Sequence, residues 1–212
     1  ILNEAADRDV VMAFVGKPHR IDDRGSQVLK SLRDIGFEHY YQAEEVGWVL
    51  YVESSTDLAM LRSFAERLDH PAKEVLERPF VHYVGNQQRK AQEHYYALRE
   101  AKPDLIGIAL YDRLEQIPPV DPVLKHLIWR KREIENHLCQ RDTLLAYAEA
   151  RGRSLQGELF AASWRTVMEE VIGQIEAALV ALGRPSPWSA GIKATDDFLP
   201  TFRIWRGEDF GI

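Results

Sequence analysis

The stretch that most constrains the fold covers residues 47–68, GWVLYVESSTDLAMLRSFAERL. Residues 48–52 are an unbroken run of strand-forming residues, too short for a globular helix, which is typical of a strand buried on both faces of a parallel sheet. Glu53 follows at the carboxyl end of that run, and hydroxyl residues 54–56 are suitable caps for a helix that begins there. An acid between a buried strand and a capped helix lies where open α/β sheets bind their ligands.

Two further apolar runs follow, and helical patterns separate them. Residues 79–85 and 105–111 are predicted strands, with a helix over 87–101 between them. This alternation predicts an α/β fold with a mainly parallel central sheet and flanking helices. Beyond residue 126 the sequence predicts a short strand that turns into a helix over HLIWRKREIENHL. A long amphipathic helix over 159–182 predicts a helical C-terminal part.

Charge and cysteine content narrow the classes of protein that fit. The formal net charge of -6 gives no global sign of nucleic-acid binding, so such binding would need a local basic patch. Cys139 is the only cysteine, which excludes an internal disulfide and a cysteine-rich zinc site. No apolar run approaches the ~20 residues of a membrane span, and we expect a cytoplasmic protein with no membrane partner.

Acidic residues gather at three of the predicted element junctions. The pairs are Glu53 with Asp57, Asp112 with Glu115, and Glu133 with Glu135. Glu53 and Asp112 both follow the carboxyl ends of predicted parallel strands, so we expect them at the same edge of the sheet. Carboxylates gathered there repel one another unless a cation neutralises them. Mg²⁺ or Mn²⁺ suits such a site, and an ion held this way can activate water for phosphodiester cleavage.

Three sequence segments together resemble a known family. VLYVESSTDL (residues 49–58) resembles the first motif of the Toprim fold, and LIGIALYDRLEQ (105–116) resembles its Asp-x-Asp motif. IWRKREIENHL (128–138) resembles the segment that marks the Toprim domain of the overcoming-lysogenisation-defect (OLD) nucleases. The resemblance covers roughly residues 47–150. It implies a metal-dependent DNA endonuclease that hydrolyses phosphodiester bonds.

The resemblance also implies which residues do the chemistry. Glu53, Asp112 and Glu135 would be catalytic. The same three, with Asp57, Glu115 and Glu133, would be the metal ligands for Mg²⁺ or Mn²⁺. The helix predicted to begin at Trp129 would place Glu133 and Glu135 about 200° apart around its axis, so only one of them can reach a given site. The resemblance favours Glu135.

Basic residues beside these acids are candidates to contact DNA phosphates. They are Arg113, Arg130, Lys131 and Arg132. The alternative for the last three is a solvated helix start. The seven histidines show no metal-ligand spacing such as His-Glu-x-x-His, and we assign none of them a catalytic role.

The family context predicts how the chain is divided. Residues 1–46, with a predicted strand over 10–15, would be the tail of a preceding ATPase-like domain, residues 47–150 the Toprim catalytic domain, and residues 151–212 a helical extension. The family places an ATPase ahead of the Toprim domain, and neither Walker motif is present here. We therefore expect a fragment of a longer chain that carries the ATPase domain, with DNA as partner and a possible homodimer through the long helix.

Departures from the family pattern keep two alternatives open. Leu114 stands where the Asp-x-Asp motif has its second acid, with Glu115 one position late, and His137 stands where the family prefers tyrosine. A leucine cannot bind a metal ion, so the first alternative is a degenerate Toprim module that binds nucleic acid or dimerises without cutting. The second is a phosphoacceptor domain like a bacterial receiver, which expects paired acids after the first strand and a lysine after a late one, and this sequence offers neither convincingly.

Overall fold

The computed structural model describes residues 12–13, 19–20, 36–116 and 118–199. They fall into two compact units, within residues 1–128 and 129–212, and each is described here by itself. The sequence predicts a boundary after residue 150. The division falls earlier because α6 (Arg141–Gln156) packs along α7 (Glu158–Ala181) and so belongs to the second unit.

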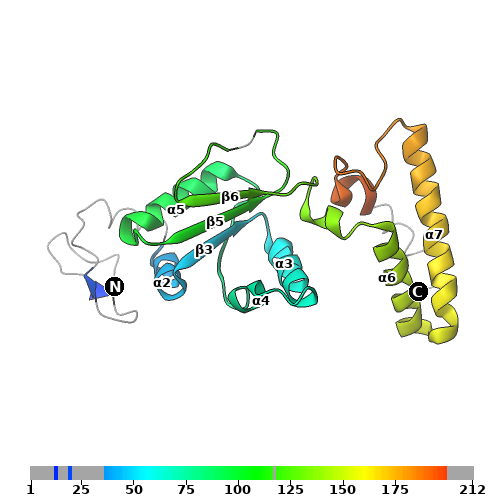
Figure 1. Cartoon of the computed structure of the whole chain (residues 1–212), viewed down its shortest axis with the longest axis horizontal. Coiled ribbons are helices and arrows are strands. Elements are labelled where there is room, and N and C mark those ends of the chain that lie inside the picture. Colours follow the sequence, from blue (N-terminus) through cyan, green and yellow to red (C-terminus); the bar gives the residue numbers. More distant parts are fainter. Residues whose placement is uncertain (1–11, 14–18, 21–35, 117, 200–212) are drawn as a thin grey trace. The chain divides into compact units, whose positions relative to one another are not determined.

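The first unit contains a four-stranded sheet in which every pair of neighbours is parallel. Its strands are β3 (Trp48–Val52), β4 (Phe80–Tyr83), β5 (Ile106–Tyr111) and β6 (Leu124–Ile128), in the spatial order β4-β3-β5-β6. Figure 1 shows β3, β5 and β6 side by side. The predicted α/β fold with a parallel central sheet is therefore confirmed, as are the strands predicted over residues 48–52, 79–85 and 105–111.

Helices cover both faces of this sheet. Strand residues alternate between faces, so Val49 and Tyr51 pack into one core cluster, whereas Leu50 and Val52 pack into another. The first cluster includes buried residues of α2 (Phe37–Val46) and α5 (Gln88–Ala101). The second includes residues of α3 (Ser55–Arg67) and Leu76, which directly follows α4 (Ala72–Val75). The sheet thus has an α2/α5 face and an α3/α4 face.

Helix α2 corrects the predicted division at residue 46. Tyr40 and Ala43 are fully buried in the cluster on the α2/α5 face, so α2 is part of the sheet unit and not the tail of another domain. Of the predicted strand over 10–15, the structure describes only β1 (Met12–Ala13), which pairs antiparallel with β2 (His19–Arg20). The remainder of residues 1–35 lies outside the described residues.

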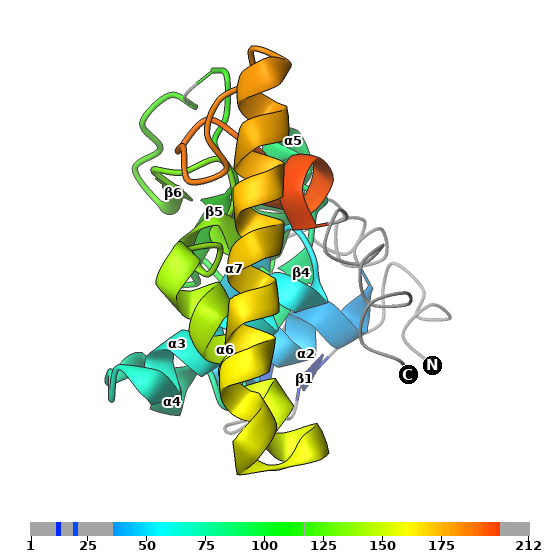
Figure 2. The same cartoon turned by 90° about the vertical axis from the view of Figure 1, so that its right-hand side faces the viewer.

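The second unit is helical, as predicted. It contains the 3₁₀ turn η2 (Ile134–His137), the helices α6 and α7, and the π-helical turn η3 (Ala194–Phe198). Figure 2 shows α6 and α7 lying side by side. Their close approach depends on Gly152, since a Cβ atom there would lie 2.6 Å from Cγ of Trp164. Within the described parts of the chain, no helix is long and apolar enough to cross a membrane.

Candidate functional site

The carboxyl edge of the sheet brings together two of the predicted site residues. β3 and β5 are parallel neighbours, and Glu53 and Asp112 directly follow them. The two residues therefore lie at the same edge of the sheet, as predicted. The chain passes from β3 to β4 on one side and then to β5 on the other, so this edge is the topological switch point at which open α/β sheets bind ligands.

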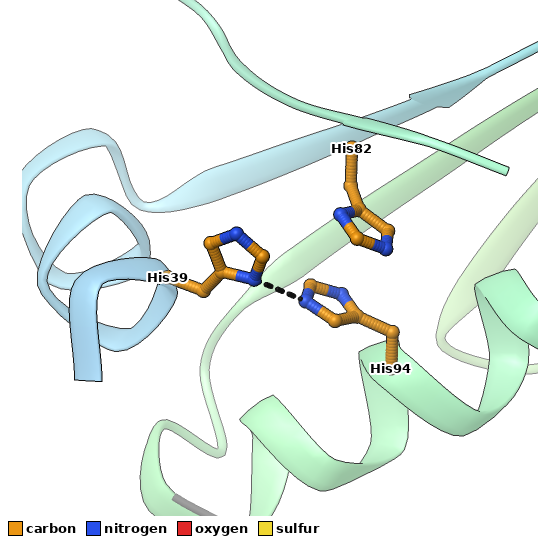
Figure 3. Close-up of side chains that lie close together, drawn as sticks. All are labelled: His39, His82 and His94. Carbon is orange, nitrogen blue, oxygen red and sulfur yellow. Dashed lines mark hydrogen bonds between the residues drawn. The ribbon is translucent and has the colours of Figure 1, made fainter. Parts of the chain in front are cut away.

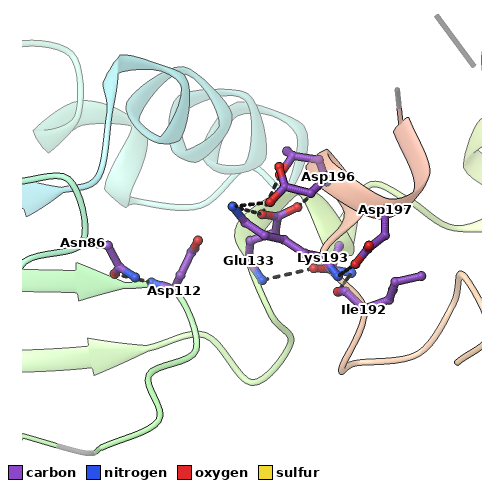
Figure 4. A network of polar contacts seen from close by, with 9 residues as sticks. Asn86, Asp112, Glu133, Ile192, Lys193, Asp196 and Asp197 are labelled. Atoms are coloured by element: carbon purple, nitrogen blue, oxygen red, sulfur yellow. Dashed lines mark hydrogen bonds and ion pairs between the residues drawn. The ribbon is translucent and has the colours of Figure 1, made fainter. Parts of the chain in front are cut away.

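The loop after β4 fixes the backbone of both acids. The Gly85 N–H donates to the carbonyl oxygen of Glu53 at 3.2 Å. The Asp112 N–H donates to Oδ1 of Asn86 at 3.1 Å, a contact drawn in Figure 4. Asn86 adopts a left-handed conformation with φ of 60°, which asparagine tolerates better than most residues. One loop thus holds two neighbouring strand ends in register.

Asp57 has a helix-capping role. It is buried, and its Oδ2 accepts a hydrogen bond of 2.7 Å from the Ser54 N–H. Ser54 in turn caps the first turn of α3, which completes a capping box. The predicted metal ligand therefore has a structural task that occupies one of its carboxylate oxygens.

Residues after Asp112 explain the departure from the Asp-x-Asp motif. Leu114 is half-buried and packs against the core of the α2/α5 face, so this position contributes to packing. Arg113 and Glu115 are exposed. Arg113 and Leu114 form no regular turn, the conformation on which convergence of Asp112 and Glu115 would depend.

Among the described residues of the second unit, Glu133 is the buried acid. Its carboxylate accepts hydrogen bonds from the backbone N–H of Thr195 at 2.6 Å and from Oγ1 of the same residue at 2.9 Å. Nζ of Lys193 lies 3.9 Å away, and Figure 4 shows Lys193 beside the Glu133 carboxylate. Only 2% of Glu133 is exposed. Its charge holds η2 and η3 together, because a buried carboxylate needs such partners.

The helix predicted from Trp129 is wrong. Residues 129–133 form no helix, and only the single turn η2 follows. Glu133 is extended, with φ of -149° and ψ of 171°, because its backbone N–H bonds Oδ1 of Asn136 to cap that turn. The separation of about 200° between Glu133 and Glu135 therefore does not apply. Glu135 lies half-buried in η2.

The predicted phosphate-binding residues fall into two groups. Nζ of Lys131 donates to the carbonyl oxygen of Asn136 at 2.8 Å, so this lysine stabilises its own loop. Arg130 and Arg132 are exposed, like Arg113 in the first unit.

Three histidines form a cluster that the sequence analysis missed. His39 from α2, His82 from β4 and His94 from α5 each offer a nitrogen, and these atoms lie within 4.8 Å of one another (Figure 3). Spacing rules fail here because the three residues come from separate elements. A signal was present nevertheless: His94 lies three residues after Ala91 and four before Leu98, on the apolar face of its helix.

No family model, curated protein or solved structure matches the chain significantly. Inferences about function therefore depend on the fold, on the acids at the carboxyl edge of the sheet and on the histidine cluster.

Proposed function

We propose that this chain is a Toprim-type nuclease domain of the OLD family that hydrolyses DNA phosphodiester bonds with Mg²⁺ or Mn²⁺. The observation that carries the proposal is the placement of Glu53 and Asp112 after two adjacent parallel strands, at the switch point of the sheet. The three motif resemblances supply the reaction class.

The residues at this edge fit a hard divalent cation. Carboxylate oxygens are the ligands that Mg²⁺ and Mn²⁺ prefer, and Glu53 and Asp112 are both half-buried at strand ends. When bound, such an ion activates a water molecule and neutralises charge on the phosphate. Glu53 and Asp112 would hold it, while the loop of Gly85 and Asn86 keeps their backbones in place. Pre-positioned ligands need no rearrangement when the substrate arrives.

Glu135 is the glutamate of the third motif that we assign to the reaction. Both carboxylate oxygens of Glu133 are bonded to Thr195, so Glu133 is assigned a structural role. The exposed Arg113, Arg130 and Arg132 are the candidates for phosphate contacts, because guanidinium groups bind phosphate oxygens in a bidentate manner.

The packing of Leu114 favours the second candidate function. Because Leu114 packs against the core, the second motif offers one acid at the strand end where the family pattern has two. A Toprim module with too few ligands would bind nucleic acid or dimerise without cutting.

A nicking assay on supercoiled plasmid separates these functions. With Mn²⁺ or Mg²⁺ we expect cleavage by the unmodified chain, and Glu53→Gln or Asp112→Asn should slow it more than about 100-fold, since metal-ion catalysis contributes several kcal/mol. Asp104→Asn is the matched control, because Asp104 is exposed and precedes β5 at the opposite edge of the sheet.

Two results would contradict the nuclease proposal. The first is cleavage by Asp112→Asn at the unmodified rate. The second is DNA binding by the unmodified chain, measured by gel shift, with no cleavage in either metal, which would establish the non-cutting module.

A further inference from the structure

We propose that His39, His82 and His94 form a second metal site, which binds one Zn²⁺ ion through three imidazole nitrogens. The site lies on the α2/α5 face of the sheet and uses none of the acids assigned above. The site joins three elements: α2, which precedes β3, the edge strand β4, and the crossover helix α5.

The spacing of two of the ligand atoms is close to what a tetrahedral ion requires. Nδ1 of His39 and Nε2 of His94 are 2.9 Å apart. Two nitrogens on one tetrahedral Zn²⁺ lie about 3.3 Å apart, given Zn–N bonds of about 2.0–2.1 Å. These two ligand atoms therefore need to separate by only about 0.4 Å. The hydrogen bond between them is the dashed line in Figure 3.

His82 completes the set from the neighbouring strand. Its ring stacks on that of His94, with centroids 3.9 Å apart and an interplanar angle of 7°. The lone pairs of two stacked rings lie in parallel planes, so ion binding requires one ring to tilt until the lone pairs converge. His82 is half-buried at the edge of the sheet, where such a tilt displaces little of the core.

The electrostatic state of the cluster suits a cation. Burial, together with the neighbouring His82 and His39, lowers the pKa of His94 to about 3. Burial and His39 also lower the pKa of His82. Both rings are therefore neutral at pH 7, and a neutral imidazole is the form that binds a metal ion.

A buried tyrosine orients the central ligand. The Tyr51 hydroxyl lies 2.9 Å from Nδ1 of His94, and Tyr51 is fully buried. Burial, with Tyr95 and Tyr111, raises the pKa of Tyr51 well above its usual value, so the hydroxyl stays neutral. When the hydroxyl oxygen accepts the Nδ1–H of His94, Nε2 keeps its lone pair for the ion. Metal-binding histidines commonly have such a partner on the second ring nitrogen.

The donor set selects the metal. Three neutral imidazoles suit zinc and its neighbours Co²⁺, Ni²⁺ and Cu²⁺, whereas Mg²⁺ and Mn²⁺ prefer oxygen ligands. Three protein nitrogens leave a fourth position for water in a tetrahedral site. His39 and His82 are half-buried, which gives water a route to that position.

The test measures metal binding directly. The untagged full chain is stripped with a chelator and titrated with Zn²⁺ by calorimetry, and Co²⁺ is then added as a spectroscopic probe. We expect one equivalent of Zn²⁺, the visible bands of a four-coordinate Co²⁺ ion, and a rise in melting temperature of about 5 °C at 100-fold excess over Kd.

Variants identify the ligands. His39→Ala and His82→Ala should each weaken Zn²⁺ binding at least about 10-fold. Both residues are half-buried, so these variants should fold, which circular dichroism checks. His126→Ala is the matched control, since His126 lies on β6 of the same sheet and outside the cluster. Asp112→Asn should leave Zn²⁺ binding unchanged, so a failure of the nuclease proposal remains distinguishable from a failure of this one.

Two results would overturn the proposal. One is the absence of Zn²⁺ binding by the unmodified chain. The other is unchanged binding in folded His39→Ala and His82→Ala, which would leave the cluster as a packing feature in which the rings stack and share hydrogen bonds.

Discussion

The sheet unit carries two groups of candidate ligands that differ in origin and chemistry. The carboxyl edge presents Glu53 and Asp112, each directly after a buried strand. The α2/α5 face presents His39, His82 and His94, which come from three elements. The first group offers hard oxygens and the second offers neutral nitrogens, so each should prefer a different ion. The two proposed metal sites of this sheet would thus be chemically distinct.

The largest effect should come from a substitution that disturbs both groups at once. Gly107 lies in β5, and a Cβ atom there would be 2.4 Å from Cε2 of Tyr95 and 2.7 Å from Cδ1 of Leu124. The Tyr95 ring cannot move aside easily, because its hydroxyl donates to the carbonyl oxygens of Leu105 and Val123. Gly107→Ala should lower the free energy of unfolding by about 2–3 kcal/mol, measured by urea denaturation.

The matched control for that variant is a glycine with free space around it. Gly173 is exposed within α7, and a Cβ atom there meets nothing within 4 Å. Gly173→Ala should raise the free energy of unfolding by up to about 1 kcal/mol. If Gly107→Ala is as stable as the unmodified chain, the contacts of Tyr95 and Leu124 with Gly107 do not constrain this position.

A smaller effect should be confined to the carboxyl edge. Asn86→Ala removes the oxygen that accepts the Asp112 N–H, so Asp112 loses a positioning contact. We expect plasmid cleavage to slow about 10-fold, as is usual when a group behind a metal ligand is lost. Zn²⁺ binding should stay unchanged. Asn86→Asp keeps both the acceptor oxygen and the tolerance of a positive φ, so it should retain more activity than Asn86→Ala.

A complementary substitution should affect the histidine cluster and leave the carboxyl edge of the sheet unchanged. Tyr51→Phe removes the hydroxyl beside Nδ1 of His94 while keeping the ring. Zn²⁺ affinity should fall about 10-fold, which is the smallest loss usual when the hydrogen-bond partner of a metal-binding histidine is removed. The free energy of unfolding of the metal-free chain should fall by about 1 kcal/mol. Calorimetry measures the first and urea denaturation the second. Equal loss of Mn²⁺-dependent cleavage and Zn²⁺ binding in this variant would mean that the two groups are not independent.

Each unit holds one motif acid that has a structural role. Asp57 lies in the same motif as Glu53, and Glu133 lies in the same motif as Glu135. Both Asp57 and Glu133 are buried, and the carboxylate of each accepts a hydrogen bond from a backbone N–H. Sequence patterns identify such residues as acids at element junctions. Sequence patterns do not distinguish an acid that caps a turn from one that faces a ligand. The two cases differ in which neighbouring segments of the folded chain lie next to the carboxylate.

Local patterns in the sequence determined the parallel sheet, its strands and the edge at which Glu53 and Asp112 lie. These features follow from runs of neighbouring residues, because strand and helix periodicity is set within one element and parallel strands share a carboxyl edge. The helix expected from Trp129 failed because the capping contacts of Glu133 with Asn136 and Thr195 outweigh helical propensity. The helix α2 was not predicted, and part of the core cluster that buries it, such as Tyr95 of α5, lies far along the chain.

The histidine cluster was decided by tertiary structure alone. His39 and His94 are 55 residues apart, and the place of His94 on the apolar face of its helix does not reveal its partners. They meet because α2 and α5 pack on the same face of the sheet, where the register of β3 with β4 sets Tyr51 opposite His82. A sequence records which residues share an element, whereas the distance between residues of different elements depends on how those elements pack.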